Sequence, residues 1–240
     1  MNLSIVIPAY NEASRIENTL RTYHSFFAAQ SHIRFELLVV PNGCTDTTIE
    51  IVERLQQELG QAILIHKTQN AGKGLAIKAG FLDALTRDNH IIGFVDADMA
   101  TRPFYFLDLI RQLDGCDGVI ASRYMPGAQV YPPRPAIKRW GSRLIYESLV
   151  RSLFKLNYYD LQCGAKVFTR PVIEKIAPLL TVKQWAFDVE LLFLCAKYGF
   201  TIKEHPTIWY DQTDSKLTMK AGMRMLGSLI KLWYQHRAEK

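Results

Sequence analysis

The sequence lacks any uninterrupted apolar run approaching the roughly 18 residues of a bilayer-spanning helix, so we expect no transmembrane segment. It opens directly on an apolar, strand-like stretch, and we expect no signal peptide. Its four cysteines are widely spaced and form no Cys-x-x-Cys pair, which argues against a structural zinc site and favours a reduced, cytoplasmic compartment. No internal repeat or long linker divides the 240 residues, so we expect one domain.

Two common nucleotide-binding motifs are also missing. The stretch from Asn70 to Gly74 looks like a P-loop, but Gly74 follows Lys73 where a P-loop has Ser or Thr, and Lys67 replaces the first glycine. The G-x-G-x-x-G fingerprint of dinucleotide-binding domains does not occur. No Ser-His-Asp or Cys-His constellation is evident. These absences weigh against a P-loop enzyme and a dinucleotide-dependent one.

The composition is that of an ordinary globular protein with an excess of positive charge. Hydrophobic residues make up 48% of the chain and charged residues 22%, which provides a core large enough to fold without disulfides or metals. The formal net charge is +6. A basic protein favours anionic partners, which include nucleic acid, phosphates and anionic membrane surfaces. Net charge alone does not choose among them.

Apolar strands alternate with amphipathic helices through the first half of the chain. We predict strands at Leu3–Ile7, Phe35–Val40, Ala62–Ile65, Ile91–Val95 and Gly118–Ala121. We predict helices over Ala13–Gln30, Ile49–Leu59, Ala76–Leu85 and Phe104–Leu113. Asn11 is expected to cap the first helix and Gly60 to end the second. This alternation is typical of α/β proteins with a mainly parallel sheet.

Two carboxylates follow the central predicted strand. Asp96 and Asp98 come directly after Ile91–Val95, and in open α/β sheets ligands bind beyond the carboxyl ends of the strands. Two carboxylates this close repel each other unless a cation lies between them, and Mg²⁺ or Mn²⁺ completed by phosphate oxygens is a suitable partner. The alternative is that this Asp-Ala-Asp stretch caps the next helix, because Asp is a favoured N-cap residue.

Polar side chains at other predicted strand ends suit a nucleotide diphosphate. Tyr10 could stack on a base or sugar, and Glu12 and Asn42 could accept hydrogen bonds from a base edge or ribose. Lys73 and Arg123 carry positive charge that suits phosphates. Taken alone, a Tyr at such a position more often packs against the protein, and a Lys there is more often a solvated charge. Together they would meet on one edge of the sheet.

The second half changes character. Pro126–Pro135 is rich in Pro and Gly and predicts a loop, while Gln162–Phe168 and Thr201–Trp209 predict strands and Phe187–Tyr198 an apolar helix. Two basic amphipathic segments are expected to be helical, residues 136–156 and 218–235. Each could be an ordinary surface helix packed on the core. Their Trp, Tyr, Lys and Arg content also suits a lipid headgroup interface, so we expect peripheral membrane contact.

These stretches resemble a known family. Ile5–Glu12 together with Asp96–Asp98 is similar to the inverting glycosyltransferases of family 2, which have the GT-A fold. Three later stretches narrow the resemblance to dolichyl-phosphate glucosyltransferases and other polyprenyl-phosphate glycosyltransferases: Asp160–Arg170, Gln184–Leu192 and Asp214–Leu217. The resemblance covers nearly the whole chain.

The resemblance implies a single α/β domain of the GT-A type, a mainly parallel sheet flanked by helices with a C-terminal acceptor-binding helical extension. Residues 1–125 would form the nucleotide-sugar half and residues 126–240 the acceptor half. The implied reaction moves a hexose, with glucose from UDP-glucose favoured, to a polyprenyl or dolichyl phosphate with inversion, using Mg²⁺ or Mn²⁺. The implied location is peripheral, on the inner, cytoplasmic face of a membrane. We expect no nucleic acid as a partner.

The resemblance also implies roles for individual residues. Those expected to act in catalysis are Asp96, Asp98, Arg123 and Lys166, of which Asp96 and Asp98 would hold the metal ion. Those expected to bind the nucleotide-sugar are Pro8, Ala9, Tyr10, Glu12, Asn42, Lys73 and Asp96. Those expected to bind the acceptor phosphate are Arg139, Arg143, Gln162, Ser215 and Lys216.

Two positions depart from relatives and leave alternatives open. Asn42 stands where relatives often carry Asp, which puts the base contact there in doubt. Ala100 stands where mannosyltransferases of this type carry a metal-binding Gln, which favours UDP-glucose over GDP-mannose. A glycosyltransferase acting on a soluble glycan would need a carboxylate base, for which Asp188 or Glu190 could serve. A non-catalytic module that binds nucleotides or nucleic acid is disfavoured, because a groove that follows phosphates gains nothing from a carboxylate pair.

Overall fold

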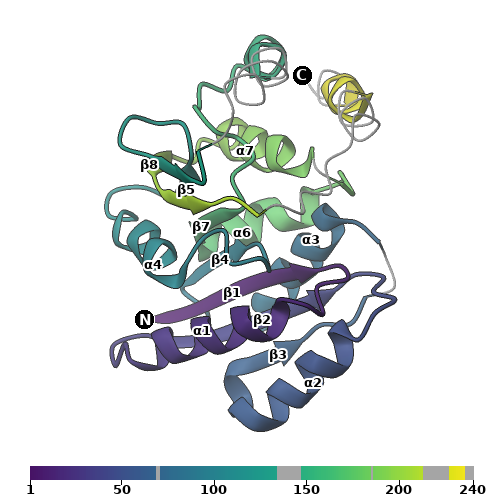
Figure 1. The fold of residues 1–240 in the computed structure, drawn as a ribbon. Helices are drawn as coiled ribbons and strands as arrows, with labels where there is room; N and C mark the ends of the chain where they lie inside the picture. The colour runs from purple at the N-terminus through teal and green to yellow at the C-terminus, as the bar shows by residue number, and fades with distance from the viewer. Residues whose placement is uncertain (69–70, 134–146, 185, 213–226, 236–240) are drawn as a thin grey trace.

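The structure is a computed structural model and describes residues 1–68, 71–133, 147–184, 186–212 and 227–235 (Figure 1). A seven-stranded sheet in the order β3-β2-β1-β4-β7-β5-β8 runs through the centre. Its strands are β1 (Asn2–Ala9), β2 (Arg34–Pro41), β3 (Ile63–Ile65), β4 (Ile91–Val95), β5 (Gly118–Ser122), β7 (Ala165–Thr169) and β8 (Ile202–Pro206). A separate pair joins β6 (Gln129–Tyr131) to β9 (Ile208–Tyr210).

The sheet is mainly parallel, as predicted. β1 lies parallel to β2 on one side and to β4 on the other, so the carboxyl ends of these three strands meet at one edge. The exception is β7, which runs antiparallel to both β4 and β5. The sequence predicted a strand here but not its direction, because direction depends on how the chain returns to the sheet. The reversed strand brings the residues just before Ala165 to the same edge.

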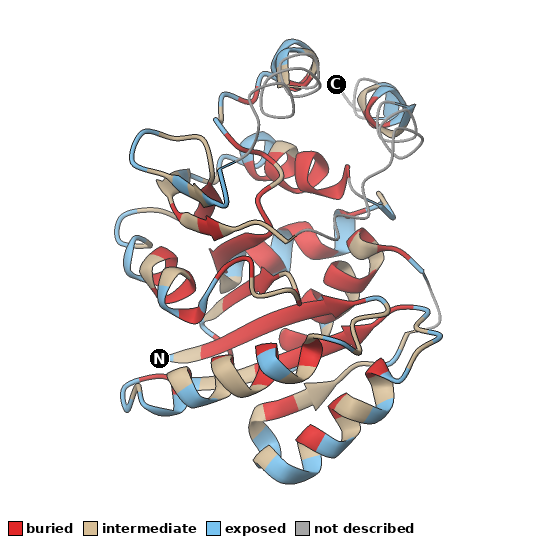
Figure 2. Ribbon diagram, in the orientation of Figure 1, coloured by how far each residue is buried: buried red, intermediate tan, exposed pale blue. Residues whose placement is uncertain are grey.

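Helices cover both faces of the sheet. They are α1 (Ile16–Ala28), α2 (Thr48–Leu59), α3 (Lys73–Ala84), α4 (Pro103–Arg111), α6 (Arg170–Ile176) and α7 (Phe187–Lys197), with the 3-10 turns η1 (Gly60–Ala62) and η2 (Ala177–Leu179). One core cluster packs α1, α2 and α4 against the sheet, and a second packs α3, α6 and α7 against its other face. Successive side chains of β1 point to opposite faces of the sheet, so the strand contributes to both clusters. Ile5 and Ile7 belong to the first cluster and Val6 to the second. The strands are accordingly buried along most of their length (Figure 2).

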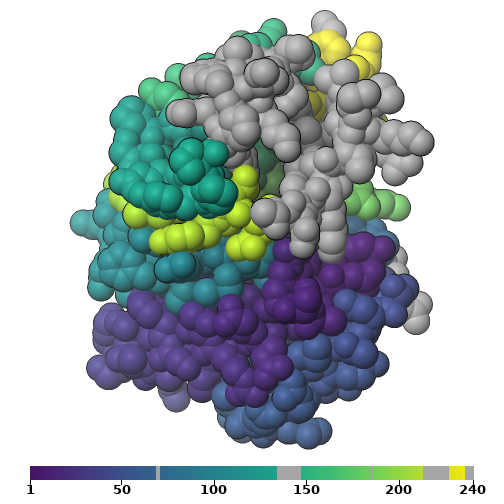
Figure 3. Space-filling model, viewed as in Figure 1, coloured from purple at the N-terminus to yellow at the C-terminus, as the bar shows by residue number. Residues whose placement is uncertain are grey.

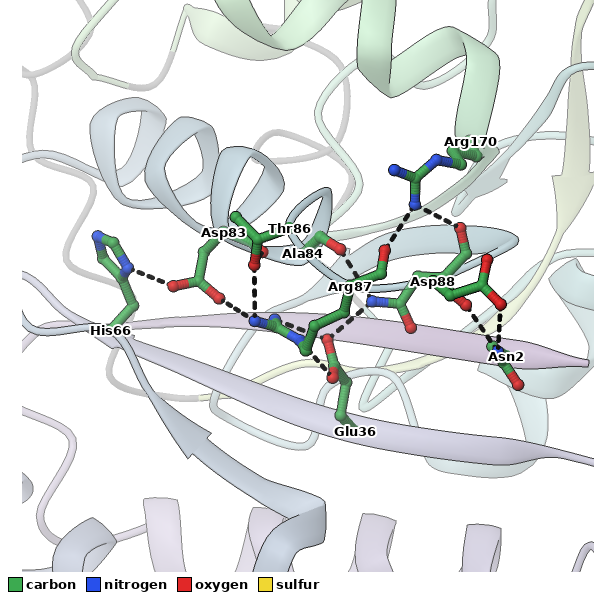
Figure 4. A network of polar contacts seen from close by, with 10 residues as sticks. Asn2, Glu36, His66, Asp83, Ala84, Thr86, Arg87, Asp88 and Arg170 are labelled. Carbon is green, nitrogen blue, oxygen red and sulfur yellow. Dashed lines mark hydrogen bonds and ion pairs between the residues drawn. The ribbon is translucent and has the colours of Figure 1, made fainter.

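A polar cluster holds α3 at the edge of the sheet where β2 and β4 begin (Figure 4). Arg87, just beyond α3, donates to the Glu36 carboxylate from Nε at 2.7 Å and from Nη2 at 2.8 Å. Arg170 at the start of α6 donates to the Arg87 carbonyl at 2.7 Å and to the Leu85 carbonyl at 2.9 Å. Asp83 joins Arg87 to His66. These contacts fix the C-terminal end of α3 against the sheet. Because a helix is stiff, they also help to fix the position of its first residue, Lys73.

Three local predictions differ from the structure. Asn11 does not cap α1: its side-chain oxygen accepts from the Thr45 backbone N–H at 2.8 Å, and Arg15 occupies the N-cap position. The predicted strand Thr201–Trp209 is interrupted at Thr207, whose N–H bonds the Ser122 carbonyl at 3.0 Å. The predicted loop Pro126–Pro135 contains β6, which needs the distant β9 as a partner and so leaves little local signal.

Two further segments, residues 147–154 and 227–235, are helical, as expected for parts of the basic amphipathic segments. They contribute to a third core cluster, in which Val150 and Phe154 are buried together with Leu229 and Leu232. Among the described helices, none is long and apolar enough to cross a membrane.

Candidate active site

The candidate site lies at the edge where β1, β2 and β4 end. Residue Ala9 of β1 pairs with Pro41 of β2, so the loops that follow these strands start side by side. The two loops are joined by hydrogen bonds, among them Glu12 N–H to Thr48 Oγ1 at 2.8 Å and Ala13 N–H to Asp46 at 3.1 Å. β4 runs parallel to β1 and ends at Val95, so the chain leaves β4 at the same edge of the sheet. The residues that follow β1, β2 and β4, among them Tyr10, Asn42 and Asp96, therefore lie along one edge of the sheet.

Asp96 is the first residue beyond β4, and the reversed strand β7 holds it. Its N–H donates to the Gly164 carbonyl at 3.0 Å. A Cβ on Gly164 would lie 1.9 Å from Asp96 Oδ2, so only glycine leaves room for this carboxylate. The φ angle of Gly164 is outside the left-handed region, which means that the requirement is purely one of space.

The Asp96 carboxylate is paired with the Lys73 ammonium at the start of α3. Burial alone would lower the pKa of Lys73, but Asp96 and then Asp188 raise it, so the side chain stays charged. Gly74, where a P-loop has Ser or Thr, donates its N–H to the Lys183 carbonyl at 3.0 Å. A Cβ there would lie 2.3 Å from a backbone oxygen. The departure from the P-loop motif thus has a packing reason.

The loop that carries Asp98 is fixed from two sides. The buried hydroxyls of Thr19 and Tyr23 in α1 donate to the Ala97 and Thr101 carbonyls at 2.7 and 2.8 Å. From the other side the Tyr210 N–H of β9 donates to the Ala100 carbonyl at 2.9 Å. Met99 adopts a φ of 61°, an uncommon value for a residue with a side chain. Such a loop holds its carboxylates in place before any ligand arrives.

The structure excludes the capping alternative for these carboxylates. Helix α4 begins at Pro103 with Arg102 at its N-cap and no side-chain cap. Asp98 instead accepts from the Ala100 N–H at 3.0 Å, within its own turn. Burial and the nearby Asp96 charge raise the pKa of Asp98 to about 6. A carboxylate destabilised in this way gains from a cation, which the site can accept.

The residues present fit a hard divalent cation. No group of three His, Cys, Asp or Glu side chains with metal-binding geometry occurs within the described part of the chain. A Mg²⁺ or Mn²⁺ ion held by Asp96 and Asp98 would therefore take most of its oxygen ligands from elsewhere, as these ions do when substrate phosphates and water complete the shell. A site with two carboxylates is suited to a metal that arrives with a diphosphate.

The residues predicted to bind the nucleoside differ in how accessible they are. Tyr10 is 47% exposed at the end of β1, whereas Pro8 and Ala9 are buried within that strand. Asn42 is buried and forms an isolated parallel bridge with Thr68. Glu12 pairs with Arg15 and offers its carbonyl to the first turn of α1. Tyr10 is thus the member of this set that presents a ring to solvent. The nucleoside-binding role stays a prediction for all of them.

Lys166 and Arg123, both predicted to act in catalysis, each form an ion pair with a buried carboxylate. Lys166 in β7 is 0% exposed and donates to Asp188 at 2.6 Å and to the Cys163 carbonyl at 2.7 Å. Arg123 donates to both oxygens of Asp160, at 2.7 and 2.9 Å. Although burial opposes it, Arg123 holds the pKa of Asp160 below its ordinary value. Both cations therefore form ion pairs that stabilise the protein. A direct contact of either cation with substrate stays a prediction.

The two carboxylates considered as a general base are also occupied. Burial raises the pKa of Asp188, which faces Lys166. Glu190 is fully buried and accepts from the Thr181 N–H at 2.9 Å and the Val182 N–H at 2.8 Å, which fixes the turn before α7. Both carboxylates are thus buried and engaged by donors of the protein itself. This counts against an acceptor that needs a general base.

The predicted acceptor-phosphate residues lie mostly outside the described residues: Arg139, Arg143, Ser215 and Lys216. Gln162 is described, with its N–H donating to Asp160 at 3.2 Å. Sequence reasoning missed Gly164, Thr19 and Tyr23, which shape or hold the carboxylate loop. Their roles depend on contacts 68 to 78 residues apart in the chain, and no local pattern marks them.

Comparison with known proteins supports this picture. Residues 4–177 match the family described as Glycosyl transferase family 2. The chain is 32% identical over 242 residues to glycosyltransferase AglD of Haloferax volcanii, covering 98% of this chain and 37% of that protein. It is 31% identical over 246 residues to the dolichyl-phosphate beta-glucosyltransferase of Saccharomyces cerevisiae, covering 90% of this chain and 69% of the yeast protein.

Solved structures share the fold. Glucosyl-3-phosphoglycerate synthase from Mycobacterium tuberculosis, in complex with Mn²⁺, uridine diphosphate and phosphoglyceric acid, superposes with a TM-score of 0.69 at 16% identity, covering 97% of this chain and 78% of that chain. Mannosyl-3-phosphoglycerate synthase from Rubrobacter xylanophilus gives a TM-score of 0.70 at 14% identity, covering 100% and 74%. Together with the family match and the carboxylate pair at the end of β4, these similarities show that the chain belongs to glycosyl transferase family 2, with the GT-A fold predicted from its sequence.

Proposed function

We propose that this protein transfers glucose from UDP-glucose to a polyprenyl phosphate with inversion, giving a β-linked glucosyl lipid phosphate. The observation that carries the proposal is the rigid pair Asp96 and Asp98 on a family 2 scaffold, combined with the similarity to the yeast enzyme named dolichyl-phosphate beta-glucosyltransferase. The chain spans only 37% of AglD and 69% of the yeast protein, so the acceptor and donor are proposals for this chain.

The chemistry of the acceptor explains the arrangement of charges. A phosphate monoester has its second pKa near 6 and is already an anionic nucleophile at neutral pH. It needs no general base, which agrees with the occupied carboxylates of Asp188 and Glu190. The difficulty is to bring two phosphate groups together, and fixed positive charge solves it. Lys73 supplies one such charge beside Asp96.

A divalent cation, when bound, would neutralise the diphosphate leaving group. Asp96 and Asp98 would hold it, and their loop would orient the diphosphate toward the acceptor. Neighbours of the same fold were solved with Mn²⁺ or Mg²⁺ and uridine diphosphate, which supports a metal and a uridine nucleotide here. The fold also occurs in a mannosyl-3-phosphoglycerate synthase, so it does not choose the sugar. Ala100 in place of a metal-binding Gln favours UDP-glucose.

A panel of nucleotide sugars with one polyprenyl phosphate tests the donor and the acceptor together. We expect glucosyl lipid phosphate from UDP-glucose and little product from GDP-mannose, and calorimetry should show tighter binding of UDP than of GDP. Faster transfer from GDP-mannose would replace glucose with mannose in the proposal. If the donor were hydrolysed and no lipid product formed, the proposal that a lipid phosphate is the acceptor would be wrong.

Arg139 and Arg143 are proposed to bind the acceptor phosphate, because their spacing of four residues suits one helix face. Replacing both with Ala should raise the KM for the lipid phosphate and leave the KM for UDP-glucose nearly unchanged. A double variant that loses affinity for the nucleotide instead would reverse the assignment of residues 1–125 and 126–240. On the same proposal, the protein works at the cytoplasmic surface of a membrane, where both substrates are accessible.

A further inference from the structure

A group of aromatic side chains lies next to the carboxylate loop and has no role in the function proposed above. Together with the cation Arg102, the rings of Phe104, Tyr105, Tyr131 and Tyr210 are called the aromatic shelf below. The shelf joins the start of α4 to the small sheet β6–β9. On the face drawn in Figure 3, the teal segment around β6 borders the lime segment around β9.

The shelf is built by strand alternation. Val130 pairs with Trp209 in register, and both pack into the core, whereas the next pair, Tyr131 with Tyr210, stacks with ring centroids 6.0 Å apart. The guanidinium of Arg102 lies 3.7 Å from the centre of the Tyr210 ring. The core pair therefore anchors the small sheet while the outer pair faces away from it.

Two rings of the shelf, one on α4 and one on β6, are exposed to solvent. Phe104 is 54% exposed and Tyr131 is 46% exposed. Phe104 also packs edge-on against Tyr105, with centroids 5.4 Å apart. Exposed rings gathered in this way mark a contact for an apolar partner more often than single exposed apolar residues do.

The shelf is continuous with the site. The Tyr210 N–H donates to the Ala100 carbonyl at 2.9 Å, and Ala100 is the residue whose own N–H donates to Asp98. Arg102 follows two residues later and is exposed, and no acidic side chain among the described residues forms an ion pair with it. One end of the shelf thus offers an available cation near the carboxylate loop, and the rest offers aromatic rings.

A cation beside the site, followed by apolar rings, complements a ligand with an anionic head and an apolar tail. We propose that the aromatic shelf binds the first isoprene units of the acceptor, with Arg102 next to its phosphate. The proposal rests on the proposed function, because it identifies the tail as that of the lipid phosphate. A lipid bilayer contacting the same rings is the competing occupant, but a bilayer does not require continuity with Asp98.

The test uses isopentenyl, geranyl and farnesyl phosphate as acceptors of increasing chain length. The double variant Phe104→Ser with Tyr131→Ser should raise the KM for farnesyl phosphate about tenfold, since each ring would lose apolar contact with the chain. The KM for isopentenyl phosphate, which has a single isoprene unit, should rise much less, and the KM for UDP-glucose should not change. Tyr198→Ser is the matched control: Tyr198 is 40% exposed and carries the Lys175 ammonium 4.4 Å from its ring centre, but it precedes β8 at the opposite edge of the sheet.

Calorimetric titration of farnesyl phosphate, with UDP and Mn²⁺ present, separates this proposal from the proposed function. Weaker binding to the double variant but not to Tyr198→Ser supports the shelf, even for a protein that transfers no glucose to lipid. Equal affinities of the double variant and the wild type would overturn it. Loss of vesicle binding with an unchanged KM for farnesyl phosphate would also overturn it, because the shelf would then contact the bilayer instead of the acceptor.

Discussion

Replacing Gly164 with Ala tests whether the position of the Asp96 carboxylate controls activity. The new Cβ would lie 1.9 Å from Asp96 Oδ2, and ordinary contact begins at 3.4 Å, so the oxygen would have to retreat by about 1.5 Å. The backbone at Gly164 cannot easily move instead, because its carbonyl accepts the Asp96 N–H. The substitution therefore displaces the carboxylate and leaves the strand in place.

The size of this displacement sets the expected loss. A misplacement of about 1 Å at a catalytic group can cost roughly 100-fold in rate, so we expect kcat/KM to fall by about that factor or more. The free energy of unfolding should fall by only about 1 to 3 kcal/mol, which is the usual cost of overpacking. Gly227→Ala is the matched control, since a Cβ there meets nothing within 4 Å and should not affect activity.

The assay combines turnover of UDP-glucose with calorimetry of UDP in the presence and absence of Mn²⁺. We expect the Gly164 variant to lose the part of UDP affinity that depends on metal and to keep the part that does not. Circular dichroism checks that the fold persists. A folded Gly164→Ala protein with wild-type metal-dependent UDP affinity would refute the reasoning, because the Asp96 carboxylate would then tolerate the shift.

Three further predictions follow from buried contacts around the site. Thr19→Val and Tyr23→Phe each remove a hydroxyl that holds the carboxylate loop; each should destabilise the protein by about 1 kcal/mol in chemical denaturation and lower kcat more than it raises the KM for UDP-glucose. Asp188→Asn leaves the buried Lys166 ammonium without its carboxylate and should cost about 3 to 5 kcal/mol, whereas the double change to Asp188→Leu with Lys166→Met should recover most of that stability. The pKa of Asp98 is raised to about 6, so folding disfavours its charged form, and lowering the pH through 6 should stabilise the metal-free protein. Protonation of Asp98 should also weaken Mn²⁺ binding over the same range. A metal affinity that rises as the pH falls through 6 would contradict the assignment.

The strands and the carboxylate pair could be predicted from the sequence because their signals are local. Ile91–Val95 is a short apolar run followed at once by Asp96 and Asp98, and the structure has β4 with the same bounds. The contribution of Gly164 could not be predicted, because its neighbour Asp96 lies 68 residues away along the chain. Nothing in one sequence shows that β7 reverses direction and delivers Gly164 to this edge.

Lys166 shows a second limit of the sequence. Its stretch, Asp160–Arg170, resembles polyprenyl-phosphate glycosyltransferases and predicts contact with substrate. In the structure Lys166 is fully buried and faces Asp188, which the sequence also offered as a possible base. The two predictions concerned one ion pair, and only the packing of α7 against β7 could reveal it. The pairing of β6 with β9, which creates the aromatic shelf, is hidden for the same reason, because the two strands are far apart in the chain.

The most direct test of the account is metal-dependent transfer from UDP-glucose to a polyprenyl phosphate, with the anomeric configuration of the product determined by NMR. We predict a β-linked glucosyl phosphate, formed with Mn²⁺ or Mg²⁺, lost with a chelator and absent from Asp98→Ala. Undiminished transfer in the presence of chelator, or an α-linked product, would contradict the central claim that Asp96 and Asp98 hold a metal and its diphosphate for direct displacement.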